Sequence, residues 1–270
     1  MNYFKNKVAI VTGASSGIGE AIAVALSEQG CKVVIAARSE AKLQLVAAKI
    51  ETLGNEVLSV VTDVSQQADC ENLVQKTIAN FGKIDIVVAN AGISMRALFK
   101  DVDTRVLENL MQVNFWGVVY CFKAAFPYIL ASQGHLVAIS SIAGVRGLPA
   151  RTAYSASKGA LNLFMESLRT ENLYTGVKVN LVCPGYTASN IRKTALNADG
   201  AAQEDSPLDE SKLMSSEAVA QHTLRAIAKN KKTVYLTGMG KLTVFLQKCF
   251  PKMMDKMVYK RVAKEKDSPF

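Results

Sequence analysis

Short apolar runs alternate along most of the chain with longer segments in which apolar residues recur at helical spacing. The runs have the length of strands, and the first of them is Val8-Ala9-Ile10-Val11. The segment that follows this run, Glu20 to Leu26, has the periodicity of an amphipathic helix. Regular alternation of strands and helices predicts a parallel sheet with helices on both faces. The hydrophobic pattern therefore predicts an α/β protein.

Seven strands and six helical segments can be placed from this pattern. The strands are expected near residues 7–11, 32–36, 57–61, 84–88, 135–140, 177–183 and 233–236. The helical segments are expected near residues 18–29, 40–53, 67–80, 103–131, 150–173 and 216–229. The longest apolar stretch, Met111 to Ala131, is interrupted by Asn114 and Lys123. We expect it to be a helix that is buried or in a subunit interface, rather than a membrane span.

The first strand leads into a glycine-rich turn, Thr12 to Gly19, that precedes a helix. Glycines allow the backbone to approach a pyrophosphate closely, and the free N–H groups of a helix N-terminus bind it. A tight turn without a ligand would also contain glycines, but the strand and helix on either side favour a dinucleotide site. The candidate binding residues of this turn are Gly13, Ser15, Ser16, Gly17, Ile18 and Gly19.

Three residues in the second half of the chain carry candidate acid–base chemistry. Tyr154 and Lys158 are four residues apart on a predicted helix, so their side chains lie on one face. A neighbouring cation favours the phenolate of a tyrosine, whose ordinary pKa is about 10. This spacing alone is common on solvated helices. Ser141, however, follows a buried strand at its C-terminal end, where side chains face the ligand crevice of a parallel sheet.

These motifs resemble those of the short-chain dehydrogenase/reductase family over about residues 6–237. The resemblance implies a Rossmann-type, doubly wound sheet and an oxidoreductase that interconverts a ketone and a secondary alcohol. It also implies cofactor contacts by Asp63, Val64, Asn90, Ala91, Gly92, Tyr154, Lys158, Pro184, Gly185 and Thr187.

The same resemblance implies a catalytic tetrad. Ser141 would bind the substrate carbonyl, and Tyr154 would deliver the proton. Lys158 would hold the nicotinamide ribose, and Asn114 would anchor a water molecule for the proton relay. A cofactor-binding sensor or scaffold without turnover is the alternative, and the complete tetrad argues against it.

The end of the second strand indicates which nicotinamide cofactor is bound. A carboxylate about 20 residues past the glycine turn would bind the ribose 2′-hydroxyl of NAD, whereas an arginine accommodates the 2′-phosphate of NADP. Here the chain has Arg38 and no acid at the strand end. Arg38 could also be a solvated residue beside a helix-capping Ser39, with Glu40 nearby. Guanidinium–phosphate pairing favours NADP(H).

A long irregular segment follows Pro184-Gly185 and extends to Ser216. It is too long for an ordinary connection, so we expect a substrate lid at about residues 186–215 with short helices of its own. Substrate identity depends on this lid and on the loops 94–96 and 145–148, and none of them has a recognisable ligand motif.

Positive charge is concentrated at the C-terminus. Residues 241–266 contain eight basic and two acidic residues, so they carry +6 of the net charge of +9. Pro251 divides this tail into two short amphipathic helices, and lysines recur at every fourth position from 252 to 264. A basic amphipathic helix is typical of a membrane-surface element. An arm packed on its own subunit or on a partner would also have solvated lysines, so both arrangements stay open.

Composition narrows the class of protein. The five cysteines form no Cys-x-x-Cys pair and are typical of buried thiols in a reducing compartment, and we expect no metal site. The first strand begins by about residue 7, so we expect no secretory signal. The basic residues lie in a methionine-rich tail without an aromatic stacking platform, so we expect no nucleic-acid partner.

The tail and residues 186–200 also resemble a narrower branch, the membrane-associated reductases similar to dehydrogenase/reductase member 7B and, less closely, 3-ketodihydrosphingosine reductase. That likeness implies a hydrophobic or lipid-like carbonyl substrate. We therefore expect an NADP(H)-dependent reductase that forms a homodimer or homotetramer. It would be cytoplasmic, with peripheral membrane contact through residues 241–266 in the membrane-surface arrangement. The reductase domain is expected to span residues 1–240 and the tail residues 241–270.

Overall fold

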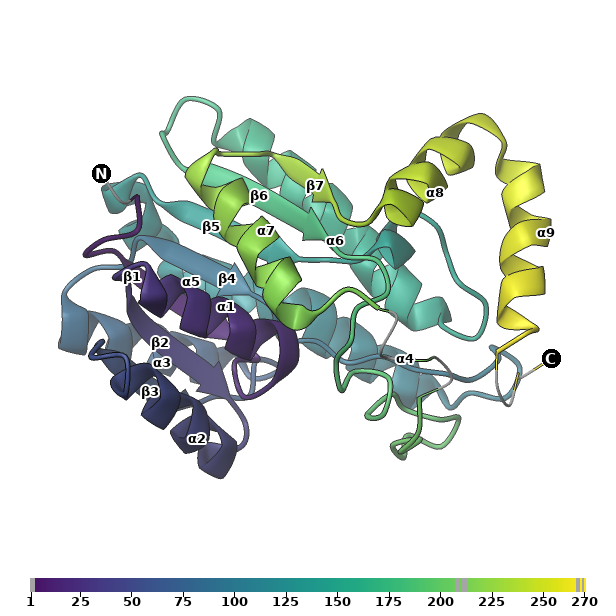
Figure 1. The fold of residues 1–270 in the computed structure, drawn as a ribbon, viewed down its shortest axis with the longest axis horizontal. Coiled ribbons are helices and arrows are strands. Elements are labelled where there is room, and N and C mark those ends of the chain that lie inside the picture. The colour runs from purple at the N-terminus through teal and green to yellow at the C-terminus, as the bar shows by residue number, and fades with distance from the viewer. Residues whose placement is uncertain (1–2, 207–208, 210–212, 266–267, 269) are drawn as a thin grey trace.

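A computed structural model of the chain describes residues 3–206, 209, 213–265, 268 and 270. Its seven strands form one sheet in the order β3-β2-β1-β4-β5-β6-β7, and neighbouring strands are parallel (Figure 1). The strands are β1 (Val8–Thr12), β2 (Lys32–Ala37), β3 (Val57–Val61), β4 (Ile86–Ala89), β5 (His135–Ile139), β6 (Lys178–Cys183) and β7 (Thr233–Tyr235). The α/β class and the seven-stranded parallel sheet are therefore confirmed.

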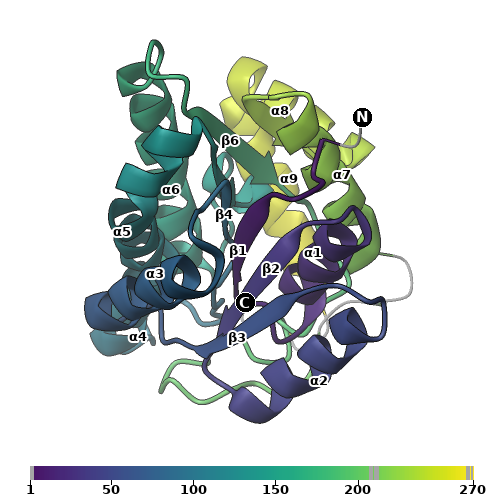
Figure 2. The same cartoon turned by 90° about the vertical axis from the view of Figure 1, so that its left-hand side faces the viewer.

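Helices cover both faces of the sheet, as the two views in Figures 1 and 2 show. One face carries α1 (Gly17–Glu28), α2 (Glu40–Glu51) and α7 (Ser216–Ala228). The other carries α3 (Gln67–Phe81), α5 (Gly117–Ser132) and α6 (Thr152–Glu171). Alternate strand residues supply the two cores: Val33 and Ile35 face the first layer, whereas Val34 and Ala36 face the second. Burial on both sides explains why the strand segments are apolar throughout.

The long apolar segment forms one continuous helix from Thr104 to Ser132. It consists of α4 (Thr104–Met111), a π-helical turn (Gln112–Trp116) and α5. By length and composition alone it could cross a membrane. In the fold, Phe122 and Ile129 are buried in the core, whereas Trp116 and Leu130 are exposed. The helix is therefore buried along one face, and a subunit interface on its exposed residues stays a prediction.

The lid differs from the expected form. Its described residues between 186 and 206 form turns and isolated bridges, such as Met95 with Leu196, and none of them is helical. The Asn197 side chain accepts hydrogen bonds from the N–H groups of Asp199 and Ala201, which stabilises a turn in place of a helix. Residues 207–208 and 210–212 of the expected lid, and Lys266 of the tail, lie outside the described residues.

The C-terminal segment forms the two expected helices, α8 (Gly238–Cys249) and α9 (Pro251–Val262). We call residues 238–265 the C-terminal arm. Its inner face packs on the same subunit, because Met254, Val258 and Val262 are buried against Leu148 and Leu246.

Three ion pairs hold the arm in this position. Glu265 is buried and lies 3.0 Å from the guanidinium of Arg151 and 3.6 Å from that of Arg96. Asp255 pairs with Arg146 at 2.7 Å. The arm begins three residues before the expected boundary at 241 and is fastened to the loop that precedes α6.

Candidate active site

A cavity of about 1510 Å³ lies at the C-terminal ends of the strands. Its walls come from the turns after the strands β1 to β6, from the lid and from the C-terminal arm. The strand order reverses between β1 and β4, which is where open α/β sheets bind ligands. The volume exceeds that of an ordinary ligand pocket, about 300–1,000 Å³, and suits a dinucleotide together with a substrate.

The glycine turn forms the floor of one end of the cavity. Gly13 and Gly17 have positive φ angles of +64° and +58°, which favour glycine. A Cβ atom on Gly19 would collide with the carbonyl oxygen of Gly13 and the side-chain amide of Asn90. Ser16 precedes α1 and makes no side-chain capping bond, so the first N–H groups of this helix face the cavity unobstructed. These features fit a pyrophosphate.

Hydrogen bonds join the ends of β1 and β4 above this floor. The Thr12 hydroxyl accepts the N–H groups of Asn90 and Ala91, each at 3.1 Å. The Asn90 side chain donates in turn to the carbonyl oxygens of Thr12 at 3.0 Å and Gly13 at 3.3 Å. These bonds fix the backbone of β1 and β4, between which the strand order reverses, before a ligand binds.

A cationic corner follows β2. Arg38, Ser39 and Lys42 line the cavity there. Ser39 is the N-cap residue of α2, but its side chain makes no capping hydrogen bond and faces the cavity. Asp63, the carboxylate of the next turn, accepts bonds from the N–H and hydroxyl of Ser65. The corner therefore offers positive charge and a hydroxyl to an anionic group, and Lys42 is a cation that sequence reasoning missed.

Tyr154 and Ser141 meet at the opposite end of the cavity. Tyr154 lies in the first turn of α6, and it lines the cavity together with Ser141, whose hydroxyl affects the pKa of the phenol. Burial raises the pKa of Tyr154, while the Ser141 hydroxyl and the charges of Arg151 and Arg192 oppose that rise. The phenol is therefore protonated at neutral pH and has a hydroxyl partner where a carbonyl oxygen can approach both.

Lys158 lies one helical turn after Tyr154 and is 4% exposed. Its ammonium group donates to the carbonyl oxygen of Ile139 at 2.9 Å. Burial lowers the pKa of Lys158 to about 8, and the nearby Cys183 thiol acts in the opposite direction. The sequence suggested that this lysine tunes the tyrosine. That role stays a prediction, and Ser141 and two arginines also oppose the rise in the pKa of the phenol.

Asn114 sits inside the π-helical turn and is fully buried. Its amide donates to the Ile93 carbonyl oxygen and to the Ser157 hydroxyl, both at 3.0 Å, and its oxygen accepts the Ile93 N–H at 2.8 Å. Asn114 therefore clamps the β4 turn onto α6 behind the cavity wall. The water-anchoring role implied by the resemblance stays a prediction.

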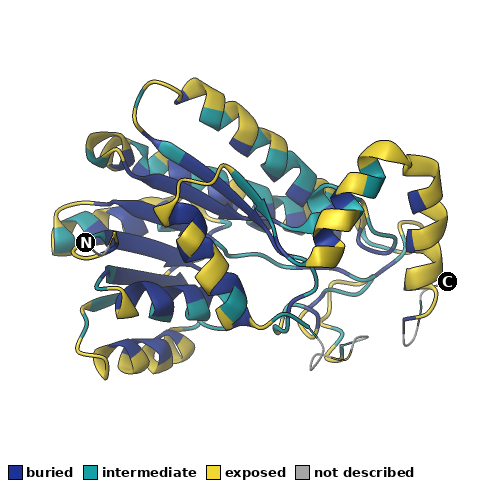
Figure 3. Ribbon diagram, turned by 45° about the horizontal axis from the view of Figure 1, so that its top comes forward, coloured by how far each residue is buried: buried dark blue, intermediate teal, exposed yellow. Residues whose placement is uncertain are grey.

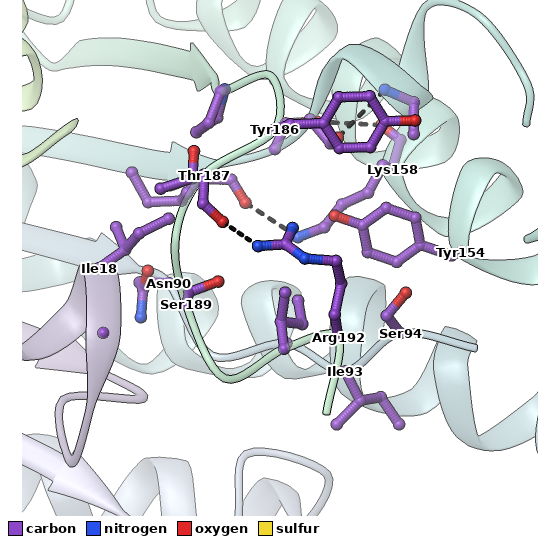
Figure 4. Close-up of a pocket in the computed structure, with 18 of the residues that line it drawn as sticks. Ile18, Asn90, Ile93, Ser94, Tyr154, Lys158, Tyr186, Thr187, Ser189 and Arg192 are labelled. Atoms are coloured by element: carbon purple, nitrogen blue, oxygen red, sulfur yellow. Dashed lines mark hydrogen bonds between the residues drawn. The ribbon is translucent and has the colours of Figure 1, made fainter. Parts of the chain in front are cut away.

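The lid brings an arginine into the middle of the cavity. The Arg192 side chain extends between Thr187 and Tyr154 (Figure 4). Its guanidinium donates to the Thr187 carbonyl oxygen, and both residues are buried. Arg192 belongs to an otherwise unremarkable stretch of lid sequence, so no pattern could have identified it. Arg192 thereby orders the turn after β6 around the end of the cavity that contains Tyr154 and Ser141, which we call the reacting end.

The C-terminal arm forms the outer wall of this end. Met239, Met254, Met257 and Val258 line the cavity, and the Arg261 guanidinium lies 5.2 Å from the centre of the Tyr186 ring. The substrate loops also contribute, through Ser94, Arg146 and Leu148. Met95 and Arg96 of the expected loop 94–96 do not reach the cavity. The amphipathic pattern of the arm was visible in the sequence, but its place against the site was not.

The predicted site residues thus converge with two exceptions. Gly19 lies beneath the floor, and Asn114 lies behind the wall. The predicted residues that line the cavity are Gly13, Ser15, Ser16, Gly17, Ile18, Arg38, Asp63, Val64, Asn90, Ala91, Gly92, Ser141, Tyr154, Lys158, Pro184, Gly185 and Thr187. Among the described residues, no group of three or more His, Cys, Asp or Glu side chains is arranged to hold a metal ion.

The family model of short chain dehydrogenases matches residues 7–200. The chain belongs to the short-chain dehydrogenase/reductase family. It is 32% identical over 272 residues to dehydrogenase/reductase SDR family member 7B of Mus musculus, covering 98% of this chain and 84% of the mouse protein. That relative confirms the branch expected from the tail and lid. The chain is also 40% identical over 187 residues to 11-beta-hydroxysteroid dehydrogenase A of Sesamum indicum, covering 68% of this chain and 53% of that protein.

Solved structures agree with this membership. A short-chain dehydrogenase/reductase of Burkholderia phymatum in complex with NAD superimposes with a TM-score of 0.83 at 27% identity, covering 94% of this chain and 97% of that one. An alcohol dehydrogenase of Thermococcus sibiricus complexed with 5-hydroxy-NADP gives 0.76 at 26% identity, covering 86% and 96%. This short-chain dehydrogenase/reductase is therefore a Rossmann-fold oxidoreductase, and its structural neighbours bind nicotinamide cofactors.

Proposed function

We propose that this oxidoreductase uses NADP(H) to interconvert a ketone and a secondary alcohol, and that its substrate is hydrophobic or lipid-like. The observation that carries the proposal is the position of the Tyr154 phenol. Tyr154 and Ser141 both line the cavity, whose walls also include the glycine floor and the apolar side chains of the arm. When bound, the nicotinamide supplies or receives the hydride that is exchanged with the substrate carbon.

The side chains at this end divide the proton chemistry among them. In the reductive direction Tyr154 donates its proton to the carbonyl oxygen, because its raised pKa keeps the phenol protonated at neutral pH. Ser141 donates a hydrogen bond to the same oxygen as negative charge develops on it. Lys158 holds the nicotinamide ribose from the next turn of α6. Asn114 positions the turn after β4 and anchors the water of the relay.

Preference for NADP(H) is supported by the corner after β2. Arg38, Ser39 and Lys42 offer two cations and a hydroxyl, and Asp63 is the one carboxylate among the described residues that line the cavity. Asp63 is already engaged by Ser65. The 2′-phosphate of NADP would form charge-assisted hydrogen bonds with these cations. The neutral 2′-hydroxyl of NAD would form no such bonds.

A hydrophobic substrate is supported by the outer wall. Met239, Met254, Met257 and Val258 give the reacting end an apolar surface whose methionines adapt to irregular shapes. The name of the sesame relative, a hydroxysteroid dehydrogenase, is consistent with an apolar ketone or alcohol.

Assembly and location complete the proposal. We propose a homodimer or homotetramer, for which the exposed Trp116, Leu130 and Leu163 of the outer helices offer apolar contact area. The five cysteines are free, which suits a reducing compartment such as the cytoplasm.

The test is turnover by the Tyr154→Phe variant with a panel of steroid, long-chain and small soluble ketones. Loss of the acid should lower kcat by ~10²–10⁴-fold and leave cofactor affinity nearly unchanged. Tyr235→Phe is the matched control, since Tyr235 lies on β7 outside the cavity. Retention of more than roughly a tenth of the wild-type kcat in Tyr154→Phe would contradict the proton-donor role. Equal turnover with NADH and NADPH would contradict the cofactor preference.

A further inference from the structure

The C-terminal arm presents an unusual number of apolar side chains to solvent. Of the 19 large exposed apolar side chains described, seven lie in residues 238–262, which are 25 of the 270 residues. These seven are Met239, Leu242, Phe245, Phe250, Met253, Met257 and Tyr259. Figure 3 shows the ribbons of α8 and α9 largely in the colour of exposed residues. Folded monomers rarely leave such a surface uncovered unless it binds something.

This outer surface is not used to hold the arm in place. The inner row Met254, Val258 and Val262 is buried, and Glu265 and Asp255 make the ion pairs with the core. Helical spacing puts Met253 and Met257 on a neighbouring row, where they are 43% and 49% exposed. The arm is therefore a fixed platform with a second apolar face.

Positive charge surrounds that second face. Lys241, Lys248, Lys252, Lys256 and Lys260 are all exposed. Both carboxylates of the arm within residues 238–265 are paired with Arg146 and Arg151 of the core. Asp255 stays exposed within its pair with Arg146. The other outward charges of the arm in the described residues are cationic, and they alternate with exposed phenylalanine and methionine.

We propose that the arm docks on an anionic phospholipid bilayer, with Phe245, Phe250 and Met253 in the interface and the lysines against the headgroups. Interfacial helices have this combination of aromatic and basic side chains, and anionic headgroups complement the charge. A second copy of the chain is a poorer occupant. A two-fold contact between two arms would place like charges opposite each other.

The docking face is continuous with the candidate active site. Met239 and Met257 are exposed and also line the cavity, so apolar surface extends from the outside of the arm to the reacting end. A lipid-like ketone would enter the cavity from the bilayer side along these methionines. This route of entry rests on the proposed function, whereas the docking itself does not.

The first experiment measures co-sedimentation of the full chain with phosphatidylcholine vesicles, with and without phosphatidylserine. We expect binding to vesicles that contain phosphatidylserine and little binding to phosphatidylcholine alone. The double variant Phe245→Ser/Phe250→Ser should bind at least about tenfold more weakly per phenylalanine removed. Leu45→Ser/Leu53→Ser is the matched control, because these exposed leucines lie at α2, away from the arm. This control should bind like the wild type.

A second variant tests the charges. Lys252→Gln/Lys256→Gln/Lys260→Gln should weaken binding by about a hundredfold at low salt. Lys229→Gln/Lys231→Gln/Lys232→Gln removes the same charge beside β7, at the end of the sheet away from the site, and should have no effect. Binding by the wild type should fall as the salt concentration rises.

The following outcomes would overturn the proposal: no binding by the full chain, binding that persists in both arm variants, or equal losses in the controls. A change of oligomeric state in Phe245→Ser/Phe250→Ser, with vesicle binding intact, would instead identify a second copy as the occupant. Turnover of a small soluble ketone without vesicles reports on the proposed function separately, and both arm variants should retain it. With a long-chain ketone, phosphatidylserine vesicles should stimulate the wild type and both control variants but neither arm variant.

Discussion

The two ends of the cavity are built in different ways. The floor of the glycine end is made by backbone and short side chains from strand ends within the first 92 residues, where Thr12 and Asn90 join β1 to β4. Arg38 and Lys42 add the cationic corner. The reacting end is closed by long side chains from segments far apart in the chain, of which the Arg151–Glu265 pair is the clearest. The first end suits a ligand whose shape never changes. The side chains that close the second end can differ to suit another substrate without any change in the sheet.

This comparison makes a physical distinction that mutation can test. Small residues at the glycine end are required because added atoms would collide with backbone, which cannot move aside. The reacting end depends on buried charge pairs, which are strongly destabilising when one partner is removed. Damage to one end should therefore leave binding at the other end largely intact.

The largest effect is expected from Glu265→Ala. It would leave Arg151 buried without its carboxylate, which typically costs about 3–5 kcal/mol. We expect the arm to separate from the core, so that KM for an apolar ketone rises while cofactor affinity is kept. Limited proteolysis of the arm and calorimetric titration of the cofactor measure the two effects. Glu56→Ala, which breaks the exposed pair with Lys32, should change little. Parallel loss of cofactor affinity in Glu265→Ala would refute the independence of the two ends.

Gly19→Ala should have the next largest effect and the opposite selectivity. The new Cβ would press on the Gly13 carbonyl and the Asn90 amide, at a cost of about 3 kcal/mol. Cofactor affinity should fall sharply, while the arm stays resistant to proteolysis. Gly147→Ala is the control, since nothing lies within 4 Å of its Cβ position. Normal cofactor affinity in Gly19→Ala would show that the floor yields and is not a rigid cradle.

Arg38→Asp sharpens the comparison within the glycine end. Replacement of a charge-assisted phosphate contact by a carboxylate should weaken the affinity for NADPH by about 10–100-fold and improve the affinity for NADH. Steady-state kinetics with both cofactors measures the change, and Lys76→Asp on the exposed side of α3 controls for net charge. An unchanged ratio of kcat/KM for NADPH to kcat/KM for NADH would show that Arg38 does not select the cofactor.

The smallest effect concerns a region that belongs to neither end. His135 begins β5 and is buried between Tyr3 and Asn180, and its burial lowers the pKa of the imidazole to about 4 from 6.5. The unfolded chain therefore takes up a proton in a range where the folded protein does not, so stability falls as the pH drops from about 6.5 to 4. Between about pH 7.5 and 5.5 the loss of stability should be on the order of 1 kcal/mol. Denaturation of His135→Gln should lack this component, and an identical pH slope would contradict it.

Much of the fold and of the glycine end could be predicted from the sequence, because the information there is local. Alternation of apolar runs with helical periodicity determined the strands and helices to within a few residues. The turn from Gly13 to Gly19, and the pair Tyr154 and Lys158, are short motifs whose geometry follows from adjacent residues. The same holds for the two helices divided by Pro251.

The sequence alone determined which residues of the arm share a row, since four-residue spacing does that on any helix. Only the tertiary structure decided that the row of Met254, Val258 and Val262 meets the core while Met253 and Met257 stay outside. Tertiary structure also decided that Glu265 reaches Arg151 across 114 positions, and that burial raises the pKa of Tyr154. The physical reason is that periodicity is a property of neighbouring residues. Burial and long-range charge pairing depend on which surfaces the folded chain brings together.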